Sequence, residues 1–176
     1  MSAPRSDIRS VLLVCLGNIC RSPMAEGILR VRAEQAGLAL QIDSAGTAGY
    51  HIGASPDPRA CVVARGQGTP IDGLRARQVS PRDFERFDLI LAADQQNLRD
   101  LQRIRPASAR AELALLLDWA EQGSGAEVPD PYYGQIEDFE SLHRLLDGAC
   151  RAVTARLLGV AEWRRLEVRD GLDAPW

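Results

Sequence analysis

VLLVCLGNICRSPM, residues 11–24, is the stretch from which the fold can be predicted. Its first four residues lie in a continuous apolar segment, residues 8–16, which is typical of a β-strand buried on both faces of a parallel sheet. Ser22 and Pro23 then favour a helix, with Ser22 as its N-cap and Pro23 as its first helical residue. Gly37 is expected to end that helix. A buried strand followed directly by a helix predicts an α/β fold.

The same alternation continues along the chain. Further strands are predicted at residues 40–44, 87–92 and 114–117, and further helices at residues 57–65, 94–104 and 136–158. We therefore expect a four-stranded parallel sheet with helices on both faces, formed by one domain over residues 1–158. Such sheets bind ligands at the carboxyl ends of their strands, where Cys15 lies. Residues 159–176 form a C-terminal tail to which the sequence assigns no structure.

Charge and hydropathy exclude several classes of protein. The chain has 176 residues and a net charge of -3, without the basic surplus typical of a nucleic-acid binder. No segment has the roughly 18 apolar residues of a membrane span, and residues 1–10 lack the apolar core of a signal peptide. We expect a cytoplasmic protein without a membrane segment, and export without a signal peptide stays open.

The cysteines indicate neither a disulfide framework nor a metal site. Thiols stay reduced in the cytoplasm, so Cys15, Cys20, Cys61 and Cys150 are expected to be free. Cys15 and Cys20 are close in sequence, but no second close pair of Cys or His accompanies them, as zinc would require. We expect no metal and no cofactor.

Cys15 and Arg21 have the spacing Cys-x5-Arg, which by itself carries little information. Cys150 and Arg156 have the same spacing inside a predicted helix, where the backbone N–H groups are already used. The context of Cys15 differs, because it lies between a strand and a helix N-terminus. The sequence here predicts an anion-binding loop.

The residues of this loop suit a phosphate group. Gly17 allows a tight loop with unusual backbone angles, and Asn18 tolerates the left-handed conformation. Arg21 can bind two phosphate oxygens at once. The positive surroundings favour the thiolate of Cys15, and the Ser22 hydroxyl can donate a hydrogen bond to its sulfur. A thiolate beneath a bound phosphoryl group is placed for in-line attack.

Attack on a phosphate ester also requires a proton for the leaving oxygen. Asp130 is the best candidate, because it lies in the segment PDPYYG, residues 129–134, which two prolines stiffen. It would first protonate the leaving group and then act as the base for the water that cleaves the phosphocysteine.

These two segments resemble the low-molecular-weight protein tyrosine phosphatases. The resemblance covers residues 8–158, is most specific at residues 14–26 and 130–133, and includes residues 43–47, 57–59, 76–78 and 97–100. It implies that Cys15 is the nucleophile, that Arg21 binds phosphate and that Asp130 is the general acid. It also implies that Ser22 stabilises the thiolate and that Asn18, with Ser44 nearby, braces the loop.

The resemblance further implies a substrate pocket with aromatic walls. The residues expected to bind substrate are Leu16, Gly17, Asn18, Ile19, Cys20, Ser22, Tyr50, Tyr132 and Tyr133. The three tyrosines suit a flat phenyl phosphate. Ile19 stands where relatives that act on phosphoarginine tend to have Thr, and its apolar side chain favours a phenyl ring. Leu74 stands where some members have a His that braces the loop, so the bracing roles of Asn18 and Ser44 are open.

One cysteine and the two histidines have roles that the motifs leave undecided. Cys20 either packs under the loop or traps an oxidised Cys15 as a reversible disulfide, and the resemblance favours this redox role. His51, near the expected pocket rim, and His143, on the last helix, are interpreted as structural.

Three functions fit the loop, and the favoured one is metal-free hydrolysis of phosphotyrosine. The second is an arsenate reductase, which would need a resolving pair of cysteines that Cys61 and Cys150 do not form. The third is a non-catalytic module that binds phosphopeptides, which would not need both Cys15 and Asp130. The expected partners are proteins that contain phosphotyrosine, such as a tyrosine kinase of the same cell or a host protein.

Overall fold

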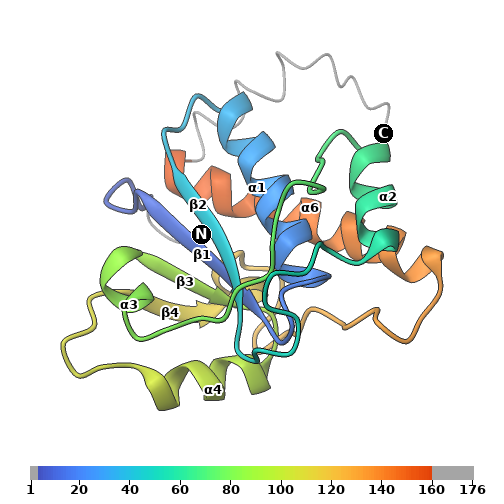
Figure 1. Ribbon diagram of the computed structural model, residues 1–176. Helices are drawn as coiled ribbons and strands as arrows, with labels where there is room; N and C mark the ends of the chain where they lie inside the picture. The colour runs from blue at the N-terminus through green and yellow to red at the C-terminus, as the bar shows by residue number, and fades with distance from the viewer. Residues whose placement is uncertain (1–3, 160–176) are drawn as a thin grey trace.

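The four predicted strands form one parallel sheet. The computed structural model describes residues 4–159 (Figure 1). Its strands are β1 (Ser10–Cys15), β2 (Gln41–Gly46), β3 (Leu89–Ala92) and β4 (Glu112–Leu115), in the order β2-β1-β3-β4. Val14 of β1 lies opposite Ala45 of β2 on one side and Ala92 of β3 on the other. The predicted fold class is confirmed.

Helices cover both faces of the sheet because successive residues of a strand point to opposite sides. On one side lie α1 (Arg21–Gln35), α2 (Pro58–Gly66) and α6 (Ile136–Leu158); on the other lie α3 (Asp83–Arg86) and α4 (Gln95–Ile104) (Figure 1). The short helix α5 (Leu116–Trp119) packs into the same core as α1 and α6. Val11 and Leu13 of β1 belong to the core with the first group of helices. Leu12 and Val14 belong to a second core with Phe84 of α3 and Leu101 of α4.

The order of the strands creates a site at one edge of the sheet. From β1 the chain passes to β2 on one side and later returns to β3 on the other, so the connections diverge between β1 and β3. Just beyond β3, the N–H of Ala93 donates to the carbonyl of Val14 at 2.9 Å. The residues that follow β3 are therefore held beside Cys15.

Several predicted boundaries differ from the structure. The strand predicted at 114–117 is present, but its bounds are wrong: β4 covers Glu112–Leu115, and Leu116–Trp119 is the short helix α5. Leu116 and Leu117 continue the apolar segment because they pack into the core, so hydrophobicity does not mark where the strand ends. The strands predicted at 40–44 and 87–92 cover Gln41–Gly46 and Leu89–Ala92, and α3 was not predicted.

The start of α1 is also corrected. Cys20, not Ser22, occupies the N-cap position, and it makes no side-chain capping bond. The end is as expected, because Gly37 follows the helix with a positive φ of 70°. Asp57, predicted as the first residue of a helix, is the N-cap of α2 and accepts a hydrogen bond from the Arg59 N–H, and Asp94 caps α4 through the Asn97 N–H.

The last helix, α6, covers Ile136–Leu158 as predicted. Gln135 and Asp138 form a reciprocal capping box at its start. Cys150 is fully buried in this helix, with its thiol 3.6 Å from the carbonyl of Ala25, so the second Cys-x5-Arg spacing forms no loop. Apart from Gly159, the predicted tail lies outside the described residues.

No helix within residues 4–159 is long and apolar enough to cross a membrane.

Candidate active site

The loop between β1 and α1 curls around the sulfur of Cys15. The backbone N–H of Asn18 donates to Cys15 Sγ at 3.3 Å, and Ser22 Oγ lies 3.0 Å from the same sulfur. Asn18 has the left-handed φ of 57°, as its residue type predicts, whereas Gly17 has no positive φ. The Asn18 N–H donates to the sulfur, and the Ser22 hydroxyl is close enough to do the same.

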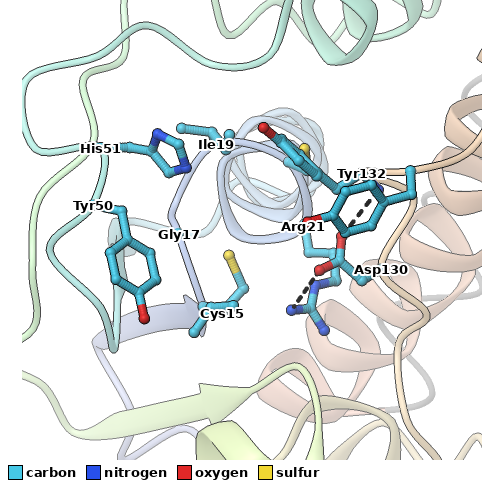
Figure 2. Close-up of a pocket in the computed structure, with 11 residues that line it drawn as sticks. Cys15, Gly17, Ile19, Arg21, Tyr50, His51, Asp130 and Tyr132 are labelled. Carbon is cyan, nitrogen blue, oxygen red and sulfur yellow. Dashed lines mark hydrogen bonds and ion pairs between the residues drawn. The ribbon is translucent and has the colours of Figure 1, made fainter.

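Cys15 lies at the base of a cavity of about 280 Å³. Figure 2 shows its sulfur between Tyr50 and His51 on one side and Tyr132 and Asp130 on the other. The cavity brings together most of the predicted site, and its lining consists of Cys15, Leu16, Gly17, Ile19, Cys20, Arg21, Tyr50, His51, Asp130, Tyr132 and Tyr133.

Asn18 and Ser22 have a different place from the one predicted, because their side chains are buried beneath the loop and do not line the cavity. The Asn18 amide donates to Ser22 Oγ at 2.8 Å and to Ser44 Oγ at 2.9 Å. The orientation of the amide is fixed because its oxygen accepts from the Arg77 N–H at 3.0 Å. Ser22 already accepts from Asn18, so its own hydrogen can go to the sulfur of Cys15 at 3.0 Å or to the Ala45 carbonyl at 3.4 Å.

Glu26 anchors the far end of this network. Its side chain is buried, and Ser44 Oγ lies 2.7 Å from its carboxylate. An ionised carboxylate only accepts hydrogen bonds, so Ser44 donates to Glu26 and accepts from Asn18. Leu74 packs against the core, and the loop is braced by Ser44, Glu26 and the Arg77 N–H without a histidine at that position. The interactions expected of Asn18 and Ser44 are therefore present.

Arg21 is buried, with 4% of its side chain exposed, and it connects three parts of the chain. One terminal nitrogen donates to Asp94 at 2.7 Å and to the Val128 carbonyl at 3.2 Å. The other lies 3.6 Å from the carboxylate of Asp130 (Figure 2). Burial alone would lower the pKa of Arg21, but the charge of Cys15 and the contacts with Asp94 and Asp130 outweigh it and raise that pKa. Arg21 stays a cation oriented for an anionic ligand.

Asp94 was missed as a site residue, although a helix was predicted to begin there. It does cap α4, and its second oxygen holds Arg21. The signal was available in the sequence, because Asp94 follows the end of a predicted strand and parallel strands end at the same edge of the sheet.

Asp130 reaches the cavity from the segment before α6. Its side chain is 46% exposed, and one carboxylate oxygen accepts from the Tyr132 N–H at 3.1 Å. The rings of Tyr132 and Tyr133 meet edge to face with their centroids 4.9 Å apart. Tyr133 is 96% exposed and Tyr50 is 78% exposed, so the aromatic wall has free surface toward solvent.

His51 lines the cavity, although the sequence analysis placed it only near the rim and interpreted it as structural. A Cβ on Gly17 would lie 3.0 Å from the ring of His51, so the lack of a side chain at Gly17 gives the ring its place against the loop. His143, by contrast, is buried on α6 and bonded to the Thr69 hydroxyl at 2.9 Å, which fits its structural interpretation.

The four cysteines are free and differ in their surroundings. Burial raises the pKa of Cys20, and the charges of Asp57 and Cys15 act in the same direction. Cys20 is therefore held as a neutral thiol. The hydrogen-bond donors of the loop, the Asn18 N–H and the Ser22 hydroxyl, lie at the sulfur of Cys15 instead. Cys61 and Cys150 are buried in α2 and α6. Cys20 does line the cavity, and its role as a redox partner stays a prediction.

No group of three or more His, Cys, Asp or Glu side chains within residues 4–159 is placed to hold a metal ion.

Gly46, at the end of β2, is expected to be intolerant of a side chain. An added Cβ would lie 2.6 Å from the Leu16 carbonyl oxygen and 3.1 Å from the Gly17 carbonyl carbon, both in the loop backbone. Gly46→Ala should therefore displace the loop, lower the free energy of unfolding by about 1–3 kcal/mol and weaken the binding of inorganic phosphate. Chemical denaturation and a phosphate titration measure both effects. Gly66→Ala is the control because no atom lies within 4 Å of its added Cβ, and equal behaviour of the two variants would contradict the prediction.

Comparison with known proteins agrees with this geometry. The family model described as low molecular weight phosphotyrosine protein phosphatase matches residues 10–160. The phosphatase of that name from Schizosaccharomyces pombe is 46% identical over 132 residues, which are 73% of this chain and 84% of the relative. The human protein of that name is 41% identical over 150 residues, which are 82% of this chain and 92% of the relative.

Solved structures give the same result. The crystal structure of YfkJ from Bacillus subtilis superposes with a TM-score of 0.77 at 41% identity and covers 88% of this chain and 97% of that one. These matches cover most of the chain, and they agree with the four parallel strands and with the loop around Cys15. The chain belongs to the low molecular weight phosphotyrosine protein phosphatases, a family of hydrolases.

Proposed function

We propose that this phosphatase hydrolyses phosphotyrosine in proteins with Cys15 as the nucleophile and Asp130 as the general acid and base. The observation that carries the proposal is that Cys15 and Asp130 line one cavity and that Arg21, beside both, lies 3.6 Å from the Asp130 carboxylate. One bound phosphate ester can therefore contact the nucleophile, the phosphate-binding cation and the proton donor at the same time.

The reaction proceeds in two steps. In the first, the thiolate of Cys15 attacks phosphorus, the bond between phosphorus and the phenolic oxygen breaks, and Asp130 gives its proton to that oxygen. In the second, Asp130 takes a proton from water, the resulting hydroxide attacks the phosphocysteine, and the sulfur leaves as a thiolate. Arg21 and the loop N–H groups stabilise the charge on the phosphoryl oxygens in both steps. The Ser22 hydroxyl, which faces the sulfur, stabilises the departing thiolate.

The shape of the cavity favours an aryl phosphate. Ile19 supplies an apolar lining, and the rings of Tyr50 and Tyr132 stand on opposite sides of the sulfur in Figure 2. A phenyl ring can contact both aromatic side chains while its phosphate reaches Cys15. The methylene group of phosphoserine is too short to make those contacts.

Kinetics with three matched peptides test this specificity. Peptides that differ only in phosphotyrosine, phosphoserine or phosphoarginine should show kcat/KM values about 10- to 200-fold higher for phosphotyrosine, the range that one apolar pocket contact can give. Ile19→Thr should narrow the difference between phosphotyrosine and phosphoarginine. Ile52→Thr, at an exposed position outside the cavity lining, is the control. Equal rates on phosphotyrosine and phosphoserine would refute the proposed substrate.

Cellular context follows from the same chemistry. An autophosphorylated tyrosine kinase is the partner that would present a suitable substrate. The reaction needs a reduced Cys15, so we expect the protein to act in the cytoplasm, where its four free thiols persist. We assign the catalytic domain to residues 1–158 and leave residues 159–176 as a C-terminal tail without an assigned structure.

A further inference from the structure

Arg59, outside the cavity lining, connects the two halves of the site. It is the second residue of α2, and its guanidinium lies 4.4 Å from the centre of the Phe139 ring of α6. It donates to both carboxylate oxygens of Asp57, at 3.0 and 2.9 Å. It also donates to the carbonyl of Gly134 at 3.0 Å and to the carbonyl of Tyr132 at 2.9 Å. One planar side chain therefore holds two backbone groups of the segment that carries Asp130.

Asp57 links this cluster to the loop around Cys15. Its backbone N–H donates to the carbonyl of Ile19 at 2.8 Å, while its carboxylate holds Arg59. The hydrogen bond from Arg59 is the main cause that lowers the pKa of Asp57, so the two groups stay an ion pair. A continuous path of hydrogen bonds thus runs from Ile19 through Asp57 and Arg59 to Tyr132 and Gly134.

Asp130 needs such external support. Its side chain is partly exposed, one oxygen accepts only from the neighbouring Tyr132 N–H, and the other is 3.6 Å from Arg21. A phosphate bound to Arg21 competes with the contact between Arg21 and Asp130. That contact therefore cannot hold Asp130 in place during the reaction. The position of the carboxyl then depends on the backbone of its own segment, which is where Arg59 donates.

We propose that Arg59 is a positioning residue that sets the distance between Asp130 and Cys15, joining the Asp130 segment to the Cys15 loop through Asp57. The proposal rests on the role of Asp130 as general acid. It assigns to Arg59 no contact with substrate, so its effect should appear only where the proton from Asp130 is needed. Lys is not an equivalent residue here, because a single ammonium group cannot reproduce a planar fork that serves a carboxylate and two carbonyls.

A series of aryl phosphates whose phenols differ in pKa tests this role. Esters of weakly acidic phenols need the proton from Asp130, and esters of strongly acidic phenols leave without it. Arg59→Lys and Arg59→Ala should lower kcat/KM roughly 10- to 100-fold for the first kind, the scale expected for a misplaced catalytic group, and leave the second kind nearly unchanged. Inhibition by inorganic phosphate should be unaffected, because Arg21 and the loop remain.

Arg156→Lys is a matched control. Its guanidinium also lies over an aromatic ring, 4.1 Å from that of Trp119, and also donates to a carbonyl, but it is not part of the cavity. It should show no dependence on the leaving group. In the background of Asp130→Asn, the Arg59 substitutions should cost nothing further, because two residues that act through one step are not additive.

The outcomes separate the two proposals. If Arg59 variants lose activity equally on all esters, or lose it again in the Asp130→Asn background, Arg59 is only structural and the inference fails. If Asp130→Asn itself shows no dependence on the leaving group, the acid role of Asp130 fails. If Arg59→Ala does not fold, Arg59→Lys supplies the same comparison.

Discussion

Cys15→Ser is expected to lower kcat on an aryl phosphate by at least about 10⁴-fold, which corresponds to about 5.5 kcal/mol of activation free energy. The sulfur is the only part of the site that forms a bond to phosphorus in the proposed mechanism. A serine hydroxyl is a weak nucleophile that needs an adjacent base, and the neighbours of Cys15, Ser22 and the Asn18 N–H, are donors. Steady-state kinetics with a chromogenic aryl phosphate gives the measurement.

The variant should keep its fold and its ability to bind phosphate. Arg21 and the N–H groups of the loop are unchanged, so inorganic phosphate should bind with an affinity close to that of the original protein. Cys61→Ser is the matched control, because it makes the same chemical change at a buried thiol outside the cavity, where Cys61 contacts the Pro56 carbonyl at 3.7 Å. Full activity of Cys15→Ser would overturn the assignment of the nucleophile.

Asp130→Asn is expected to have the second largest effect. It removes the proton donor and should lower kcat/KM on esters of weakly acidic phenols by about 10²–10⁴-fold, the usual contribution of general acid catalysis. The loss should be much smaller for esters of strongly acidic phenols. Rates measured with both kinds of ester check this result.

Asp72→Asn provides the comparison for this substitution. Asp72 is exposed and pairs with Arg65 away from the cavity, and such surface pairs contribute little to stability. It should leave the rate unchanged on both kinds of ester. An Asp130→Asn variant that loses the same factor on both kinds of ester would assign the proton to another group.

The sequence predicted the architecture well because the signals for it are local. Val11 to Val14 are continuously apolar, as a strand buried on both faces requires, and α6 begins after Gln135 where a capping box forms. The exact end of β4 was not predictable, because Leu115 and Leu116 are equally apolar although one is in a strand and the other in a helix. Hydrophobicity reports burial, and both residues are buried.

The centre of the site was predictable and its supports were not. Cys15, Arg21 and Asp130 belong to motifs in which residue type and spacing carry the chemistry. Asp94 and Arg59 act through contacts with residues 73 and 75 positions away in the sequence. The place of Asp94 after a predicted strand puts it at the right edge of the sheet, but no periodicity or spacing identifies its partner or the partners of Arg59. Such pairs exist only when the sheet has assembled. Side chains that position other side chains are the part of the site that required the structure.

The contacts of Arg21 have a consequence for what can enter the cavity. Its charge is already shared with Asp94 and with the nearby Asp130 before any ligand arrives. An incoming phosphate therefore meets an arginine whose charge is already partly balanced by two carboxylates. The N–H groups of the loop must supply the rest of its hydrogen bonds. This arrangement favours an anion whose shape fits the loop over a small anion that contacts Arg21 alone.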